Sequence, residues 1–167
     1  DQNTFNDTAY NSHMIYGSPV QQDFESWTLM QTIESCYWNY TAGADGDGWT
    51  QDQYDGGEWR LNEGSTGTSG TGPLMDYSEQ TLDGNYLYLE GWCGGTVCNL
   101  ISPCLDFAQD KYAVSFAYHM YGSEMGSLSI DVWDGTMWVN DVWIMAGDMG
   151  NQWYTASVNL AAFSNAE

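Results

Sequence analysis

Short runs of alternating apolar and polar side chains, broken by Gly- and Asp-containing turns, constrain the fold of this chain most strongly. In the run 112–121, every second residue is apolar or aromatic, and the residues between them are mostly small or polar. Side chains repeat with period two along a strand and with period 3.6 along a helix, so the pattern predicts β-strands. No segment shows a convincing helical period. Similar runs occur at 84–91, 127–133, 138–145 and 153–160.

These runs predict an all-β chain whose antiparallel strands form a sandwich or a barrel. Asp134-Gly135 lies between two runs and predicts a hairpin turn. The segment 41–72 is rich in Gly, Asp, Ser and Thr, and it predicts a long ordered loop with little regular structure. Residues 1–22 are polar and predict an N-terminal arm with one short strand, followed by a single domain over 23–167.

The charge balance excludes several classes of function. The 167 residues include 23 acidic and 2 basic side chains, which gives a formal net charge of −21. Binding to nucleic acid or docking on anionic lipid requires clustered Lys and Arg, which this chain lacks. Aromatic residues make up 16% of the chain, which favours a packed core over disorder. The excess carboxylates either form a solvated acidic surface or gather in part around hard cations.

Four cysteines fit two disulfides, which indicates an oxidising, extracellular or periplasmic environment. Three pairings are possible. We favour Cys93–Cys98 as one small loop, which leaves Cys36–Cys104 as the second bridge. Zinc fits poorly, because the two histidines do not form the usual second ligand pair. The chain starts at Asp1 without Met or a signal peptide, so we expect a processed product or a piece of a longer chain.

The sequence gives little indication of catalysis. His119 lies inside a regular run, and we expect it to make a structural hydrogen bond. The paired carboxylates of glycosidases are harder to exclude among so many acids, but no stretch places two Glu and one Asp in tight alternation on one strand. We therefore predict a protein without enzymatic activity, and a glycosidase is the third hypothesis.

An acidic segment offers candidate metal ligands. The Asp-Gly-Asp-Gly sequence at 45–48 resembles the start of an EF-hand loop, but the required Glu would fall at Gly56, so that motif fails. Three more carboxylates follow within 52–58. Crowded carboxylates repel one another and a divalent ion relieves the repulsion, so this segment is either a Ca²⁺ site that pins the loop or a solvated acidic loop.

Aromatic residues are more numerous than one core needs. Nine Trp and 12 Tyr are present, and Trp133 falls on the polar face of its predicted strand. Exposed rings stack on sugars or form protein interfaces. Trp133 and Trp92 are therefore candidates for ligand stacking, whereas most other rings are expected to be core or edge cover.

A set of short motifs follows one order along roughly residues 24–160. They are Phe-Glu-Ser at 24–26, Gly-Trp-Thr-Gln at 48–51, Thr-Gly-Pro with an Asp at 71–76, Gly-Asn-Tyr-Leu-Tyr-Leu-Glu at 84–90, Leu-Ile-Ser-Pro-Cys at 100–104, Tyr-His-Met-Tyr-Gly with Met-Gly-Ser-Leu-Ser-Ile at 118–130, and Trp…Val-x-Leu at 153–160. This ordered set resembles the MAM domain family, extracellular modules of meprins, neuropilins, receptor tyrosine phosphatases and secreted bacterial proteins.

The resemblance implies a jelly-roll β-sandwich of two antiparallel sheets, without catalytic activity, that acts in adhesion, oligomerisation or substrate recognition. Some members bind Ca²⁺ near the opening Phe-Glu element, which implies Glu25 as a ligand. The acidic segment adds Asp45, Asp47 and Asp55 to the expected set of structural Ca²⁺ ligands, and the central block adds Asp76.

One departure from the family pattern concerns the end of the chain. The family continues past the Val-x-Leu strand with two more strands, whereas this chain stops at Glu167. We expect further polypeptide or another chain to complete the sandwich, with the arm 1–22 as a candidate donated strand.

Together these features predict an extracellular adhesion and assembly module, stabilised by Ca²⁺ and disulfides. Its expected partners are proteins, including identical subunits joined by strand exchange. The alternative is a carbohydrate-binding module of a secreted polysaccharide-degrading enzyme, which would bind glycans. Neither nucleic-acid binding nor membrane insertion is expected.

Overall fold

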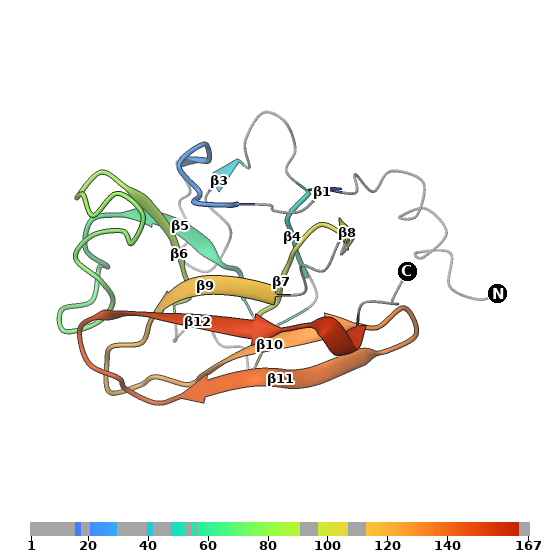
Figure 1. Cartoon of the computed structure of the whole chain (residues 1–167). Helices are drawn as coiled ribbons and strands as arrows, with labels where there is room; N and C mark the ends of the chain where they lie inside the picture. Colours follow the sequence, from blue (N-terminus) through green and yellow to red (C-terminus); the bar gives the residue numbers. More distant parts are fainter. Residues whose placement is uncertain are drawn as a thin grey trace.

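The computed structural model of this chain describes an all-β protein with one short 3-10 helix, η1 (Ala161–Phe163). Figure 1 shows the strands arranged as a β-sandwich, which confirms the predicted fold class. The described residues are 16–17, 21–29, 40–41, 48–52, 55, 57–90, 97–106 and 113–163.

Within these residues each strand pairs with one other strand. The ladders β9–β12, β10–β11 and β5–β6 are antiparallel and the most extensive, and the β1–β8 pair is parallel. The strands are β1 (Tyr16–Gly17), β2 (Thr28–Leu29), β3 (Tyr40–Thr41), β4 (Thr50–Gln51), β5 (Arg60–Glu63), β6 (Asn85–Tyr88), β7 (Leu100–Ile101), β8 (Leu105–Asp106), β9 (Ala113–His119), β10 (Ser127–Trp133), β11 (Trp138–Ala146) and β12 (Trp153–Asn159).

The strands after residue 84 follow the predicted runs. β10 has the predicted bounds, and β6, β9, β11 and β12 differ from their runs by a few residues at the ends. In β10, Leu128, Ile130 and Val132 are less exposed than the residues between them, so the two faces alternate as predicted.

The predicted hairpin turn joins β10 to β11. Trp133 pairs with Trp138 at the end of the ladder, and the Asp134 N–H donates to the Met137 carbonyl at 3.1 Å. Gly135 has a φ of +90°, a conformation that glycine adopts without steric cost. The sequence prediction at Asp134-Gly135 is therefore confirmed.

Aromatic rings fill the space between the long ladders. The Trp143 ring of β11 lies edge-on to the rings of Phe116 and Tyr118 on β9, at 5.0 and 5.2 Å between centroids. The Trp153 ring of β12 lies 6.1 Å from that of Tyr86 on β6. Edge-to-face pairs of this kind add to the free energy of burial. Tyr86 and Tyr118 are buried, whereas Phe116, Trp143 and Trp153 are half-buried, so these rings form the core together with its edge.

The segment 41–72 is more regular than predicted. β4 pairs with β7, and β5 pairs with β6. β5 carries one apolar side chain, Leu61, which is fully buried. The expectation of little regular structure was therefore wrong at β5. One apolar residue does not make an alternating pattern, so the sequence did not indicate this strand.

The N-terminal arm contributes the predicted short strand. β1 lies within 1–22 and forms a two-residue parallel ladder with β8 of the same chain. Among the described residues, no helix combines the length and the apolar character needed to cross a membrane.

Candidate functional site

Asp76 organises the loop that precedes β6. Its buried carboxylate accepts hydrogen bonds from the Ser78 hydroxyl at 2.9 Å, the Glu79 N–H at 2.6 Å and the Thr81 N–H at 2.9 Å. Burial alone would raise the pKa of Asp76, but these donors outweigh it and lower the pKa below the ordinary value. The side chain is therefore a charged anchor for the loop.

Glu25 reaches the same loop from the segment before β2. Its carboxylate oxygens accept the Asn85 N–H at 3.0 and 3.2 Å. The Asn85 side chain in turn donates to the carbonyls of Phe24 at 3.2 Å and Trp27 at 3.3 Å. Asn85 therefore ties the Phe-Glu segment to the start of β6.

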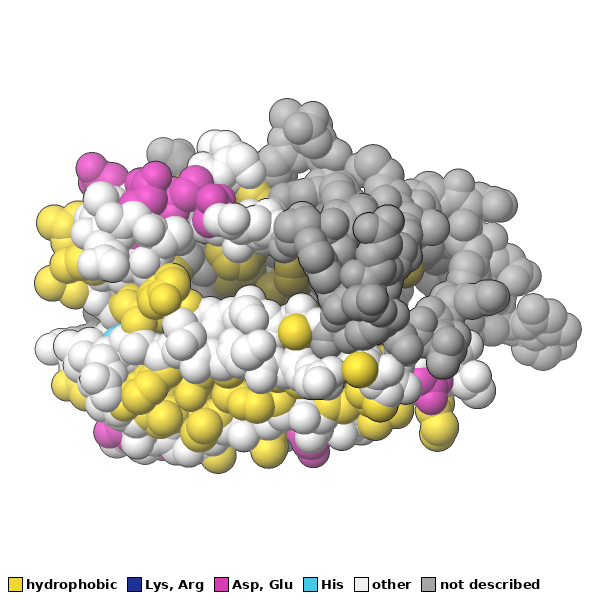
Figure 2. Space-filling view, in the orientation of Figure 1, with side chains coloured by type: hydrophobic (Ala, Val, Ile, Leu, Met, Phe, Trp, Pro, Cys, Tyr) yellow, Lys and Arg dark blue, Asp and Glu magenta, His cyan; other side chains and the backbone are white. Residues whose placement is uncertain are grey.

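Glu25 and Asp76 approach one Ser78 hydroxyl. Its oxygen lies 2.9 Å from Asp76 Oδ2 and 3.4 Å from Glu25 Oε1, and it has a single proton to donate. Burial raises the pKa of Glu25, the Asn85 N–H opposes this, and the charges of Glu79 and Asp76 raise it further. Figure 2 shows acidic side chains gathered over the loops at the β5–β6 end of the molecule. The local excess of negative charge is of the kind that a bound cation relieves.

The fit of this site to Ca²⁺ is partial. Ca²⁺ takes six to eight oxygen ligands, and carboxylate and hydroxyl oxygens are of the right chemical type. In the part of the chain that the structure describes, however, no three or more His, Cys, Asp and Glu side chains gather closely enough to hold a metal. Backbone carbonyls or water would have to supply the other ligands. Asp45 and Asp47, predicted as ligands, lie outside the described residues.

Asp55 lies in a second acidic cluster, between β4 and β5. Its carboxylate accepts the Gly57 N–H at 3.2 Å and the Asn99 N–H at 2.5 Å. Glu58 is only 9% exposed, and its buried Oε2 has no hydrogen-bond partner. Burial, and then the charges of Asp55 and Asp52, raise the pKa of Glu58. The structure thus brings Glu25 and Asp76 together and places Asp55 in a different cluster.

Each predicted disulfide joins one cysteine that the structure describes to one that lies outside the described residues. Cys98 is half-buried and Cys104 is exposed, and neither forms a disulfide within the described part of the chain. Their predicted partners, Cys93 and Cys36, lie outside it. Burial, and then the charges of neighbouring carboxylates, raise the pKa of the Cys98 thiol. A raised pKa reduces the thiolate fraction and hence its reactivity.

His119 makes the structural hydrogen bond that the sequence predicted. Its Nε2 lies 3.1 Å from Asn151 Oδ1, and its ring packs edge-on to Trp153 at 5.4 Å between centroids. Burial lowers the pKa of His119, which favours the neutral imidazole.

Trp133 is exposed on the polar face of β10, as predicted. It is 38% exposed, and Trp138 opposite it is 51% exposed. The two ring centroids are 5.8 Å apart, with the ring planes inclined at 62°. Trp92, the other stacking candidate, lies outside the described residues.

Sequence reasoning missed four residues of the Glu25–Asp76 site, which are Ser78, Glu79, Thr81 and Asn85. Ser78 and Glu79 follow Asp76 closely, and an Asp that bonds backbone groups shortly after itself is typical of turns, so a local signal was present. Asn85 acts between segments that lie 60 residues apart in sequence. No local pattern indicates such a contact.

The family assignment rests on a profile described as MAM domain, meprin/A5/mu, which matches residues 36–167. The chain belongs to the MAM domain family. This MAM domain is 36% identical over 122 residues to the MAM domain-containing glycosylphosphatidylinositol anchor protein 1 of Gallus gallus. That alignment covers 68% of this chain and 13% of that protein.

Two further relatives agree with this assignment. The human protein of the same name is 33% identical over 123 residues, which cover 68% of this MAM domain and 13% of that protein. Neuropilin-1 of Xenopus laevis is 35% identical over 101 residues, which cover 55% of this chain and 10% of that protein. This MAM domain therefore matches only a small part of the length of each relative.

Proposed function

We propose that this MAM domain is a non-catalytic extracellular module that makes protein–protein contacts in a cell-surface or secreted assembly. The observation that carries the proposal is membership of the MAM family over residues 36–167. The name of the first relative includes a glycosylphosphatidylinositol anchor, which supports a cell-surface setting for that protein and, by similarity, an extracellular one for this chain.

The test is binding of the fluorescently labelled chain to intact cells of its source organism. We expect saturable binding that is lost after the cells are treated with protease and kept after treatment with glycosidases. Loss after glycosidase treatment alone would favour the alternative function, a carbohydrate-binding module. Absence of saturable binding would contradict the proposal.

We propose that a structural Ca²⁺ ion binds at the Glu25–Asp76 site. Support comes from the two carboxylates on one hydroxyl, from the raised pKa of Glu25, and from the hard-oxygen chemistry that Ca²⁺ prefers. The disulfides Cys93–Cys98 and Cys36–Cys104 are proposed as additional stabilisation. Their support is the even number of cysteines and the extracellular setting.

Strand exchange between copies is proposed as a mode of self-assembly. β1 is held by a parallel ladder of only two residue pairs, so little structure has to open before it leaves β8. After exchange, β1 of one copy would pair with β8 of the other copy through the same backbone hydrogen bonds. Sedimentation velocity should show concentration-dependent dimers of the full chain, and none for a chain that lacks residues 1–22. A full chain that stays monomeric at every concentration would contradict this mode.

A further inference from the structure

The β10–β11 hairpin presents a face with exposed aromatic rings. Trp133 and Trp138 stand opposite each other at the end of the ladder, and both are exposed. Met137, in the connecting turn, is 60% exposed. Large apolar side chains exposed side by side on a strand pair commonly mark a contact surface.

The turn beneath these rings is held in one conformation. Asp134 Oδ1 accepts the N–H groups of Thr136 and Met137, each at 2.8 Å. The Asp134 N–H closes the turn onto the Met137 carbonyl. A surface that is ordered before binding loses less conformational entropy when a partner docks.

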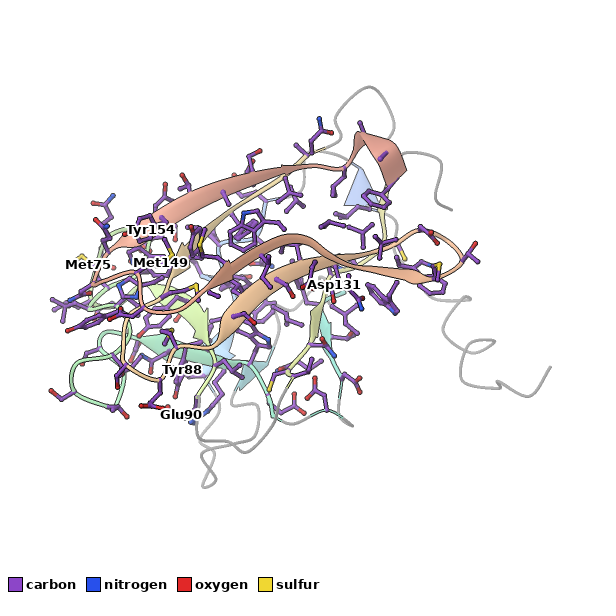
Figure 3. The ribbon with its side chains drawn as sticks, turned by 90° about the horizontal axis from the view of Figure 1, so that it is seen from below. Met75, Tyr88, Glu90, Asp131, Met149 and Tyr154 are labelled. Carbon is purple, nitrogen blue, oxygen red and sulfur yellow. The ribbon has the colours of Figure 1, made fainter. Side chains whose placement is uncertain are left out.

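Carboxylates flank the rings on the same hairpin. Asp131 lies two residues before Trp133, on the same exposed face of β10, and its Oδ1 accepts the Asp141 N–H at 2.8 Å. Asp141 has a φ of +55°, at the irregularity in the β10–β11 ladder. Figure 3 shows Asp131 on this strand pair. The sequence has no Lys or Arg between residues 113 and 163, so the hairpin supplies no basic partner of its own for these acids.

We propose that Asp131, Trp133, Trp138 and Asp141, called here the hairpin face, bind a basic segment of a partner protein. An Arg or Lys side chain of the partner would stack on an indole ring and pair with a neighbouring carboxylate. Trp is the strongest cation–π acceptor among the side chains, and Arg combines stacking with bidentate pairing to carboxylates. The proposal names the partner chemistry for the protein-contact function proposed above and rests on it.

Charge and ring geometry favour this occupant over two others. A second copy of the chain would bring an equally acidic hairpin face to the contact, and like charges placed together disfavour binding. A sugar ring is bound best by a flat aromatic platform, whereas these two rings are inclined at 62°. A net charge of −21 also accelerates the encounter with a basic partner.

The test uses the full chain and a synthetic peptide of alternating Arg and Gly, followed by NMR. We expect saturable shifts of the indole N–H signals of Trp133 and Trp138. An acidic chain attracts any basic peptide weakly. The result is therefore decided by which signals shift and by whether the affinity depends on the two indole rings. Trp133→Ala should weaken the affinity about threefold and the double change with Trp138→Ala roughly tenfold, whereas Leu74→Ala, at an exposed apolar residue elsewhere, should leave it unchanged.

A second variant guards against misfolding of the Trp variants. Asp131→Asn keeps the rings and an oxygen that can accept the Asp141 N–H, and it should weaken binding while the spectrum stays folded. Shifts spread evenly over the acidic surface, or unchanged affinity in the double Trp variant, would overturn the inference. In the cell assay above, unchanged binding by that variant would refute the hairpin face alone, whereas failure of the unaltered chain would refute the proposed function.

Discussion

Asp76 occupies the space beside Gly84, so that any side chain at Gly84 would overlap its carboxylate. A Cβ placed on Gly84 would lie 2.3 Å from both Asp76 Cγ and Asp76 Oδ1, far closer than non-bonded atoms approach. Gly84→Ala should therefore displace Asp76 from its backbone donors and lower the free energy of unfolding by about 1–3 kcal/mol. Urea denaturation measures this.

Gly67→Ala is the matched control for this substitution, because a Cβ at Gly67 meets no atom within 4 Å. Its effect should stay within about 0.5 kcal/mol. Equal stabilities of the two variants would show that the close approach of Gly84 to Asp76 is not needed for the fold.

Asp76→Asn should weaken the loop and change the acid response of the protein. The lowered pKa of Asp76 means that its contribution to stability is present above its ordinary pKa and is lost as pH falls through the folded-state pKa. The unaltered chain should therefore lose stability below about pH 4, and the variant should lose less over the same range. At neutral pH the variant should be less stable by about 2 kcal/mol, measured by urea denaturation. Parallel pH profiles for the two proteins would contradict this role.

Glu58→Gln should stabilise the protein at neutral pH. The raised pKa of Glu58 means that its favourable contribution is complete below its ordinary pKa and is lost as pH rises through the folded-state pKa. The neutral amide removes a buried charge, and we expect a gain of roughly 1 kcal/mol at pH 7 that disappears near pH 4. Thermal denaturation at both pH values measures it. The exposed Glu124→Gln serves as control and should show no such difference.

Ca²⁺ should raise the melting temperature if it binds at the Glu25–Asp76 site. Ca²⁺ at about 100 times its Kd would stabilise the fold by about 2.7 kcal/mol, and excess EDTA should reverse this. Glu25→Gln should abolish the response, while Glu124→Gln keeps it. A melting temperature that is the same in Ca²⁺ and in EDTA would end the case for a structural ion.

The disulfide proposal is tested by peptide mapping without reduction. We expect one peptide pair that links Cys93 to Cys98 and another that links Cys36 to Cys104. Peptides that join Cys36 to Cys93 or Cys98, or four unpaired thiols in protein secreted into an oxidising medium, would contradict it.

The sequence predicted the strands whose alternation extends over several residues. β10 shows this clearly, because all seven of its side chains alternate between exposed and half-buried, and the first four of β9 do the same. β5 was missed because one buried residue, Leu61, carries its apolar face. Glu25 and Asp76 were found through the family resemblance. Asn85, which binds Glu25 and the Phe24 carbonyl, acts through tertiary contacts that leave no local pattern.

The contacts of Asn85 extend the packed domain to residues that precede the stretch matched by the family profile, 36–167. Asn85 fastens the backbone of Phe24 and Trp27 to β6, and the Trp27 ring is buried against Phe24 at 5.0 Å between centroids. A recombinant fragment that begins at residue 36 would lack Phe24 and Trp27. Its apolar surface beneath Trp27 would be exposed, and the Asn85 amide would lose both carbonyl acceptors. A fragment designed from the profile boundaries alone would therefore be less stable than the full chain.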